Sequence, residues 1–436
     1  MSKKKLLVAT VASLALVGLG AALYSNNNTA ADDVADDQVT AAQASPADPA
    51  AIARGAYVSI QGDCAACHSV PGGKPFAGGY GLQTPFGVVY STNITPALNT
   101  GLGHWTERDF FRAVRHGKHK DGQLLYPAMP YNAYVRFNDD DMHDLWAYIR
   151  SLQPVEQPAK QNTLGFPYNI RLAMHGWNLL FFDNSPFQAD PSQSEQWNRG
   201  RYLVDGAGHC ASCHTPKNLL GGDTGRYLQG ADVAGSHAPE ITGDRYHGLG
   251  AWSAEQIQQY LKTGSNHQAV ASGTMAEVIE FSSQYLNDHD LAAIAEYLHS
   301  LPGSQAAKPE ALAQATPVMR RGAAVYEHNC MACHNVGGEG IPGMVTGFAD
   351  NPGIRAASHS NLVTTVLAGS RAAITDANVT GAGMPSFDWK LSNADIAAVL
   401  TYVRNSWGNA APEIPAAEVA RAREYLGKQA NLQNGF

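Results

Sequence analysis

The sequence is poor in charged residues and lacks the common motifs of catalysis. Charged side chains make up 16% of its 436 residues, and the formal net charge is −8. Because a negative chain repels the phosphate backbone, no nucleic-acid partner is expected. The sequence has no Gly-x-Gly-x-x-Gly after a predicted strand, no phosphate-binding loop, no Gly-x-Ser-x-Gly and no His-Glu-x-x-His. These absences indicate that the chain does not oxidise an organic substrate by itself.

Cysteine is also absent outside three short segments, and each segment has the form Cys-x-x-Cys-His. They are Cys64–His68, Cys210–His214 and Cys330–His334, and together they contain all six cysteines. This is the attachment spacing of c-type haem, in which both cysteines form thioethers with one porphyrin and the histidine supplies an axial nitrogen. Three haem c groups are therefore predicted. Their covalent attachment residues would be Cys64, Cys67, Cys210, Cys213, Cys330 and Cys333.

Two other chemistries use closely spaced cysteines. A structural zinc site needs four ligands, and three separated motifs cannot be paired without leaving one of them incomplete. A thioredoxin-like disulfide would follow a strand in a βαβ unit, and no such pattern surrounds these segments. Haem attachment is therefore the preferred interpretation.

The surroundings of the three motifs are repeated along the chain. Before each motif stands an Arg-Gly pair in a segment that is expected to form a short opening helix, at Ile52–Gln61, Trp197–Val204 and Val318–His328. Each repeat ends in a segment that starts with Asn or Ser, carries acids in its first turn and has apolar residues at helical spacing. These predicted closing helices are Asn138–Ile149, Asn287–Leu298 and Ser392–Val403. The glycine of the opening helix and the aromatic residue of the closing helix would let the two cross closely.

The domain organisation follows from this repeat. A helix is also expected in the middle of each copy, after Trp105, after Trp252 and, with a weaker pattern, near His359. Stretches rich in Pro, Gln and Ala, at Gln153–Gly165 and from Pro302 to Thr316, are expected to be linkers. The predicted domains are residues 51–153, 190–302 and 317–408. A C-terminal tail follows at 409–436, in which Glu418–Leu426 could form a short, mildly amphipathic helix, although a solvated tail is preferred.

The N-terminus has the pattern of an export signal. Lys3–Lys5 precede an uncharged run from Leu6 to Tyr24. At about 1.5 Å per residue this run is just long enough to cross a bilayer, and Gly20–Ala22 offers a cleavage site. Residues 1–24 are therefore expected to be a signal peptide or a membrane anchor, and residues 25–50 a disordered tether. In both cases the lysines would stay in the cytoplasm and the rest of the chain would be exported.

The order of opening helix, Cys-x-x-Cys-His, long loop and closing helix resembles cytochrome c. Three such units behind an export signal resemble the cytochrome c subunit of membrane-bound bacterial dehydrogenases of the alcohol, gluconate, sorbitol and fructose type. The first domain is similar to that family at Tyr90–Pro96, Gly101–Trp105 and Arg115–Gly117, and the resemblance covers about residues 50–408. It implies an all-α protein of three tandem cytochrome c domains with long haem-wrapping loops, preceded by an N-terminal signal or anchor helix.

The second axial ligand of each iron has to come from elsewhere in the domain. His68, His214 and His334 supply the first, and the second would be a methionine, another histidine or absent. Three methionines are favoured by the family pattern and by the prolines beside Met129 and Met384. In addition, His68 and Met129 are separated by the same number of residues as His214 and Met275. These predicted ligands are Met129, Met275 and Met384. Met275 is followed by Ala276 instead of proline, so its loop is expected to be less rigid.

Other ligands remain possible from the sequence alone. Met142 is a rival in the first domain, although its place in a closing helix favours a core role, and Met344 is an earlier candidate in the third. Ligation by two histidines is the other alternative. Its candidates are His116, His119, His237 and His267.

An iron with two protein ligands passes single electrons and does not bind substrate. The chain is therefore expected to be the electron-transfer subunit of a dehydrogenase complex on the periplasmic side of the bacterial cytoplasmic membrane. The resemblance implies a partner subunit that uses flavin, PQQ or molybdenum to oxidise an alcohol, sugar, sugar acid or aldehyde, with ubiquinone in the membrane as the acceptor. The alternatives are a stand-alone multihaem peroxidase or reductase with one open iron, and a soluble electron shuttle.

Overall fold

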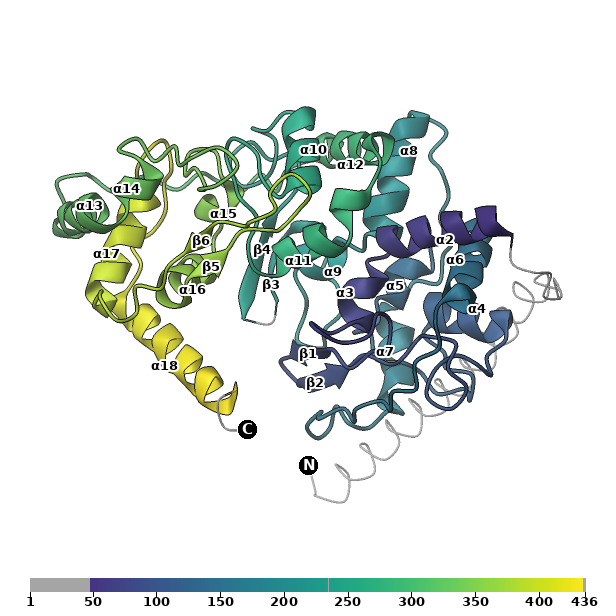
Figure 1. Ribbon diagram of the computed structural model, residues 1–436. Coiled ribbons are helices and arrows are strands. Elements are labelled where there is room, and N and C mark those ends of the chain that lie inside the picture. The colour runs from purple at the N-terminus through teal and green to yellow at the C-terminus, as the bar shows by residue number, and fades with distance from the viewer. Residues whose placement is uncertain (1–47, 234, 434–436) are drawn as a thin grey trace, which may run out of the picture. The chain divides into compact units, whose positions relative to one another are not determined.

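Each cysteine motif is associated with an opening helix and a closing helix that pack against each other. The computed structural model describes residues 48–233 and 235–433 (Figure 1). The opening helices are α2 (Pro49–Gln61), α8 (Glu195–Tyr202) and α13 (Pro317–Asn329). The closing helices are α6 (Asp139–Ser151), α12 (Asp288–Ser300) and α17 (Asn393–Val403). All six were predicted from the repeat, and their observed ends differ from the predicted ends by only a few residues.

The closing helices begin where the sequence provides a side-chain cap. Asn138, Asn287 and Ser392 each accept a hydrogen bond from the backbone N–H three residues later. Acidic residues follow in the first turn of each helix, where the helix dipole favours negative charge. The cap and the dipole together explain why these helices start at the predicted positions.

Each helix crossing depends on a glycine. In all three copies, a Cβ atom on the glycine of the opening helix would lie 1.8–2.2 Å from a carbonyl oxygen of the closing helix. The three pairs are Gly55 with Asp144, Gly200 with Ala293 and Gly322 with Ala398. The predicted aromatic residues lie at the same crossings, with the Cβ atoms of Tyr148, Tyr297 and Tyr402. The close crossing inferred from the Arg-Gly pairs is therefore confirmed.

The three middle helices are also present. They are α4 (Glu107–His116), α10 (Ala254–Thr263) and α16 (Ser360–Ala368). Thr106 and Ser253 form capping boxes at the starts of α4 and α10, and both helices end at a glycine with positive φ, Gly117 and Gly264. Helix α16 has no side-chain cap, which agrees with the weaker pattern of the third copy.

The long loops contain short antiparallel strands, so the expectation of an all-α protein is only partly correct. Three two-stranded sheets occur in the described residues (Figure 1). Their strands are β1 (Gly81–Thr84) with β2 (Gly87–Tyr90), β3 (Gln229–Val233) with β4 (Ser236–Glu240), and β5 (Ser370–Arg371) with β6 (Gly383–Met384). The strands are two to five residues long, too short for an alternating pattern to identify them in the sequence.

Further short elements complete the loops. They are α5 (Tyr131–Tyr134), α7 (Ala173–Phe181), α11 (Thr274–Phe281), α15 (Pro352–Arg355), a π-helix at Leu203–Ala207 and a 3-10 helix at Ser283–Tyr285. The stretch predicted as the first linker, Gln153–Gly165, contains no helix or strand, and its last residues lie along β2. There, Thr163 exchanges backbone and side-chain hydrogen bonds with Val88, and the Asn162 side chain accepts one from the N–H of Tyr90.

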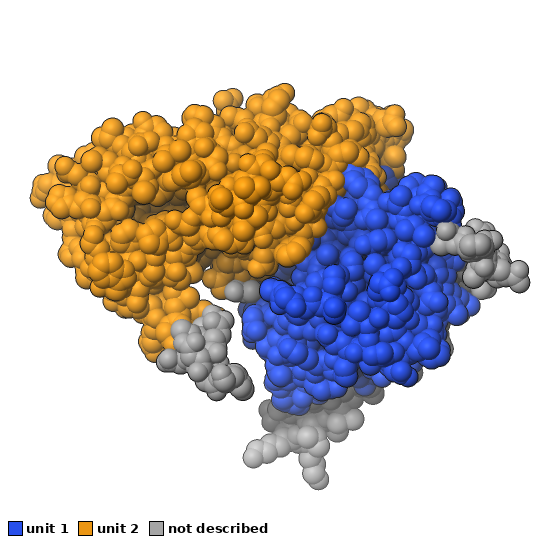
Figure 2. Space-filling model, in the orientation of Figure 1, with its two compact units in different colours: residues 1–188, 205–209, 217–223 blue, residues 189–204, 210–216, 224–436 orange. Residues whose placement is uncertain are grey.

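The chain divides into two compact units (Figure 2). Unit 1 contains the first cysteine motif and comprises residues 1–188, 205–209 and 217–223, and unit 2 contains the second and third motifs and comprises residues 189–204, 210–216 and 224–436. The second and third copies therefore share one compact unit.

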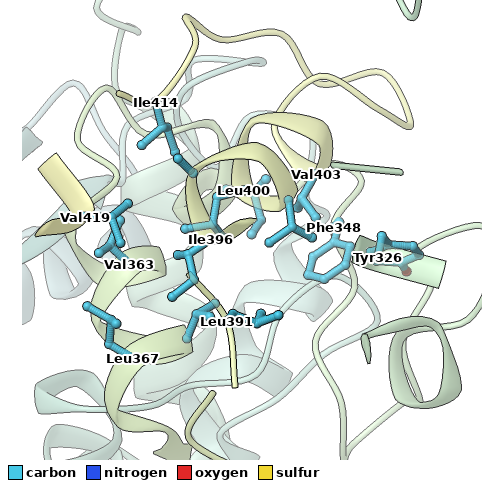
Figure 3. Close-up of a cluster of buried hydrophobic side chains, with 14 residues drawn as sticks. Tyr326, Phe348, Val363, Leu367, Leu391, Ile396, Leu400, Val403, Ile414 and Val419 are labelled. Carbon is cyan, nitrogen blue, oxygen red and sulfur yellow. The ribbon is translucent and has the colours of Figure 1, made fainter. Parts of the chain in front are cut away.

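The C-terminal segment forms the helix that was considered at Glu418–Leu426, but this helix is longer and is packed, so the preferred solvated tail is wrong. Helix α18 (Ala416–Gln433) places Val419, which is fully buried, beside Val363 of α16 (Figure 3). The guanidinium of Arg423 donates to the side chain of Asn393 and to the carbonyl oxygen of Leu391. The prediction failed because the apolar positions of this helix are few, whereas burial of a few residues against an existing core is enough to hold it.

Within the described residues, no helix combines the length and the apolar character that crossing a bilayer requires. The predicted signal or anchor segment 1–24, and the predicted tether up to residue 47, lie outside the described residues. The last residues of that tether begin helix α2, which Asp48 caps through its side chain.

Candidate haem-binding sites

Each cysteine motif includes one turn of helix. The turns are α3 (Cys64–His68), α9 (Ala211–His214) and α14 (Met331–His334). On a helical turn, two side chains three positions apart lie on the same face, so each cysteine pair can reach one edge of a porphyrin. None of the six cysteines forms a disulfide, and burial raises the pKa of the Cys64 and Cys330 thiols to about 11 in both cases. Without haem, the thiols of Cys64 and Cys330 would therefore be protonated at neutral pH and be poor partners for disulfide exchange.

The histidine of each motif is oriented by a backbone carbonyl group. The Nδ1 atoms of His68 and His214 lie 2.7 Å from the carbonyl oxygens of Thr92 and Pro239. The Nδ1 atom of His334 lies 3.2 Å from the carbonyl oxygen of Thr346. A carbonyl oxygen only accepts, so Nδ1 must carry the proton and Nε2 keeps its lone pair. This is the tautomer that an axial iron ligand needs, and it occurs in all three copies.

Burial keeps these histidines neutral. It lowers the pKa of His68, His214 and His334, outweighing the hydrogen bonds to the carbonyl oxygens, which by themselves would raise it. A neutral imidazole is the form that binds a metal. The three motifs therefore fit c-type haem in both their thiols and their imidazoles.

The zinc and disulfide alternatives receive no support from this geometry. A structural zinc site brings several Cys, His or acidic side chains together. No group of three or more such side chains is arranged to hold a metal ion within residues 48–233 and 235–433. None of the six cysteines forms a disulfide, so the disulfide alternative has no bonded pair among the motifs.

Met129 lies in a turn that is held by a buried tyrosine. The backbone N–H of Met129 donates to the carbonyl oxygen of Tyr126, and the N–H of Tyr131 donates to that of Met129. The ring of Tyr131 is fully buried, and its hydroxyl group donates to the side chain of Asn178 in α7 at 2.7 Å. Met129 is half-buried, and its turn is held in place through Tyr131 by Asn178 of α7, a helix that follows the first closing helix.

Met275 lies in the first turn of α11 and is half-buried. It packs against a small buried cluster formed by Ala271, Ala276, Ile279 and Ala373. No proline stiffens this segment, as the sequence already indicated, so other contacts hold it.

The third copy brings its candidate residues around one core. Met384 in β6 and Cys330 both pack against the buried cluster that contains Tyr326 and Phe348. Figure 3 shows these two aromatic side chains within the cluster. The ring of His334 stacks on Phe348, with 4.6 Å between ring centroids. Cysteine, histidine and methionine of this copy therefore share the same apolar surroundings. Iron ligation by Met129, Met275 and Met384 remains a prediction.

The rival ligands have other positions. Met142 is fully buried in α6, which gives it the core role that the sequence favoured, and Met344 is 54% exposed. Three of the four alternative histidines contact a polar side chain through Nδ1: His116 contacts Asn184, His119 contacts Asp121 and His237 contacts Asp232. The fourth, His267, is exposed.

Sequence reasoning missed the carbonyl groups that orient the histidines. A signal existed in two copies, because Thr92 and Pro239 each stand two residues before an Ile-Thr pair. Thr346 in the third copy has no such neighbours, so this partner could not have been found from the repeat.

Three copies, each with crossed helices, a Cys-x-x-Cys-His turn and a histidine that presents Nε2, define a three-domain c-type cytochrome. A family model described as cytochrome c matches the chain at residues 52–153, 198–302 and 319–407. The chain belongs to the cytochrome c family and carries three haem c groups.

Relatives of similar length narrow the class. The chain is 38% identical to the gluconate 2-dehydrogenase cytochrome c subunit of Pantoea cypripedii, over 92% of this chain and 94% of that protein. It is 38% identical to the fructose dehydrogenase cytochrome subunit of Gluconobacter japonicus, over 87% and 84% of the two chains. It is 36% identical to the alcohol dehydrogenase (quinone) cytochrome c subunit of Gluconacetobacter polyoxogenes, over 88% and 86%. The chain is thus an electron-transfer cytochrome c subunit of this family and not a dehydrogenase on its own.

Proposed function

We propose that this chain carries electrons from a periplasmic dehydrogenase subunit to ubiquinone. The partner would oxidise an alcohol, sugar, sugar acid or aldehyde with flavin, PQQ or molybdenum. The observation that supports this proposal most directly is the threefold repetition of a neutral histidine with its Nε2 lone pair free. Three equivalent ligand sets on one chain suit a relay, whereas an enzyme needs one site that differs from the others.

The side chains of this protein have defined tasks in such a relay. When bound, c-type haem supplies reversible one-electron chemistry. The cysteines hold it covalently, and the carbonyl groups of Thr92, Pro239 and Thr346 keep each imidazole oriented and basic. Buried rings such as Phe348, which is 7% exposed, exclude water from the third site. Exclusion of water limits reorganisation and favours electron transfer over reaction with small molecules.

We further propose that Met129, Met275 and Met384 are the second axial ligands. Thioether ligation raises the reduction potential and closes the iron to exogenous ligands. Each methionine is half-buried within the domain of its histidine. The reduced wild-type protein is expected to bind no carbon monoxide, and Met129→Ala is expected to open one of the three irons to it. Carbon monoxide binding by the wild-type protein would favour the alternative of a stand-alone peroxidase or reductase.

An apolar surface on unit 1 supports attachment to the periplasmic face of the membrane. Several large apolar side chains in and near α7 are more than half exposed, at 81% for Phe166, 76% for Leu172 and 65% for Leu180. Leu219 is 95% exposed. The next residue, Leu220, accepts a hydrogen bond at its carbonyl oxygen from the Nε1–H of Trp177 in α7. Large exposed apolar side chains in and near one helix suit the boundary between lipid head groups and acyl chains.

One preparation tests both the electron path and the membrane attachment. The complete complex should leave the membrane with detergent and not with concentrated salt. After removal of this chain, the dehydrogenase subunit is expected to reduce a small dye at its former rate but to lose quinone reduction. Undiminished quinone reduction would contradict the electron path, and release by salt alone would favour a soluble shuttle.

A further inference from the structure

The methionine of the second copy lies in a helix with weak ends. Helix α11 has eight residues, and its N-cap, Gly273, offers no side chain to bind the first turn. An isolated helix of this length is unstable in water, so tertiary contacts must hold it. Met275 is the second residue of this helix, and its position therefore depends on whatever fixes α11.

A segment of the third copy, residues 371–376, makes these contacts. Glu280 of α11 accepts two hydrogen bonds from the guanidinium of Arg371, at 2.8 and 3.2 Å. The same carboxylate accepts a third from the backbone N–H of Ile374 at 2.7 Å. Burial alone would raise the pKa of Glu280, but the hydrogen bonds from Arg371 and Ile374 have the larger combined effect. The net pKa is therefore lowered, and the side chain stays ionised. The side chain of Glu280 is only 15% exposed, which limits screening of the pair by solvent.

The backbone of this segment also joins the second copy. The N–H of Ala373 donates to the carbonyl oxygen of Ala271 at 3.1 Å, and Ser272 and Ala372 form an antiparallel bridge. Ala373 is 1% exposed and belongs to the buried cluster against which Met275 packs. The contact is close, since a Cβ atom on Gly264 would lie 2.7 Å from that of Ala373.

The segment is fixed in turn by the third copy. Arg371 belongs to β5, which pairs with β6, so that Ser370 lies opposite Met384 and Arg371 opposite Gly383. The two predicted methionine ligands of unit 2 are therefore connected through β5, the Arg371–Glu280 ion pair and α11. Met384 has Pro385 and its own strand pair to hold it, whereas Met275 has no equivalent within its own copy.

We propose that Arg371 and Glu280 are positioning residues for Met275, so that the third domain maintains the axial ligand of the second. The inference rests on the proposed role of Met275 as an iron ligand. It explains how a methionine without flanking prolines is kept in place. It also means that the second haem site is incomplete without the third domain.

The test uses the full-length holoprotein with three haems and compares three variants. Arg371→Gln removes the ion pair, and Met275→Ala removes the ligand itself. Arg54→Gln is the matched control, because Arg54 forms a two-point ion pair with Asp144 in the first copy, at 2.6 and 2.8 Å, and lies in the other unit. Two properties are measured: the weak red absorption band of ferric haem with a thioether ligand, and carbon monoxide binding after reduction.

Met275→Ala is expected to lose about a third of the red band and to bind carbon monoxide at one iron. Arg371→Gln should shift both signals in the same direction and lower one of the three reduction potentials, while Arg54→Gln should match the wild type. Glu280→Gln, which keeps an acceptor for the N–H of Ile374, should give a smaller change and serves if Arg371→Gln folds poorly.

Two results would overturn the proposal and can be told apart. If Met275→Ala changes both signals and Arg371→Gln and Glu280→Gln change neither, the ion pair does not position the ligand. If Met275→Ala changes neither signal, Met275 is not a ligand and the basis of the proposal is lost. Neither result would bear on electron transfer to quinone, which the complex lacking this chain tests separately.

Discussion

Replacing Gly55 by alanine is expected to reduce the free energy of unfolding by about 3 kcal/mol, because the two helices of the first domain could no longer cross. The added Cβ atom would lie 1.8 Å from the carbonyl oxygen of Asp144 and 2.9 Å from the Cβ atom of Tyr148. Both are close to rigid backbone, so the helices have to separate and lose part of their contact. Alanine has the higher helix propensity by about 1 kcal/mol, and this gain is too small to compensate.

Gly176 provides the matched control for this substitution. It also lies within a helix of unit 1, α7, and a Cβ atom there would meet nothing within 4 Å beyond its chain neighbours and the backbone of its own helix. Gly176→Ala should therefore be neutral or slightly stabilising. Chemical denaturation followed by far-ultraviolet circular dichroism measures both variants, and equal stabilities for Gly55→Ala and Gly176→Ala would contradict the close crossing.

Replacing Arg199 by glutamine is expected to cost about 3 kcal/mol, because it removes the charged partner of a buried carboxylate. The guanidinium of Arg199 binds both carboxylate oxygens of Asp290 at 2.8 Å, and the Asp290 side chain is only 3% exposed. Glutamine cannot restore the positive charge, so the carboxylate would remain in a poorly solvated place.

The equivalent pair of the first copy should respond much less. The Arg54 side chain is 60% exposed and that of its partner Asp144 12%, so water replaces much of what the pair provides. For Arg54→Gln we expect a much smaller loss of stability than for Arg199→Gln. Thermal unfolding of both variants at low and high salt makes the comparison, and a similar loss in the two would show that burial does not decide the strength of these pairs.

The helices were predictable because their signals are local. Each closing helix has its cap, its acids and its apolar stripe within a dozen residues, and each opening helix has the Arg-Gly pair. Even here the ion pairs differ in detail. In the second and third copies, the arginine of the opening helix binds the third residue of the closing helix, Asp290 or Asp395. In the first copy, the equivalent arginine binds Asp144, which lies one turn further along the closing helix. The sequence offers acids at both positions of α6, so the pattern alone does not select one.

The contacts between copies could not be predicted in the same way. The Arg371–Glu280 pair joins residues 91 positions apart, and neither residue belongs to a repeated pattern. Val419 in α18 was missed for a similar reason, since its burial depends on a surface of α16 and α17 that exists only after folding. Local signals thus define the haem-binding units, and non-local packing joins them.

The use of main-chain oxygens to orient the three histidines has a consequence for how this protein can change. Substituting Thr92, Pro239 or Thr346 alters a side chain but leaves the accepting atom in place, and the three copies already differ there in residue type. This support for the imidazoles is therefore insensitive to most point mutations. Differences in reduction potential among the three haems must then arise from features that substitutions of side chains can change. These are solvent access, nearby charge and the geometry of the second axial ligand.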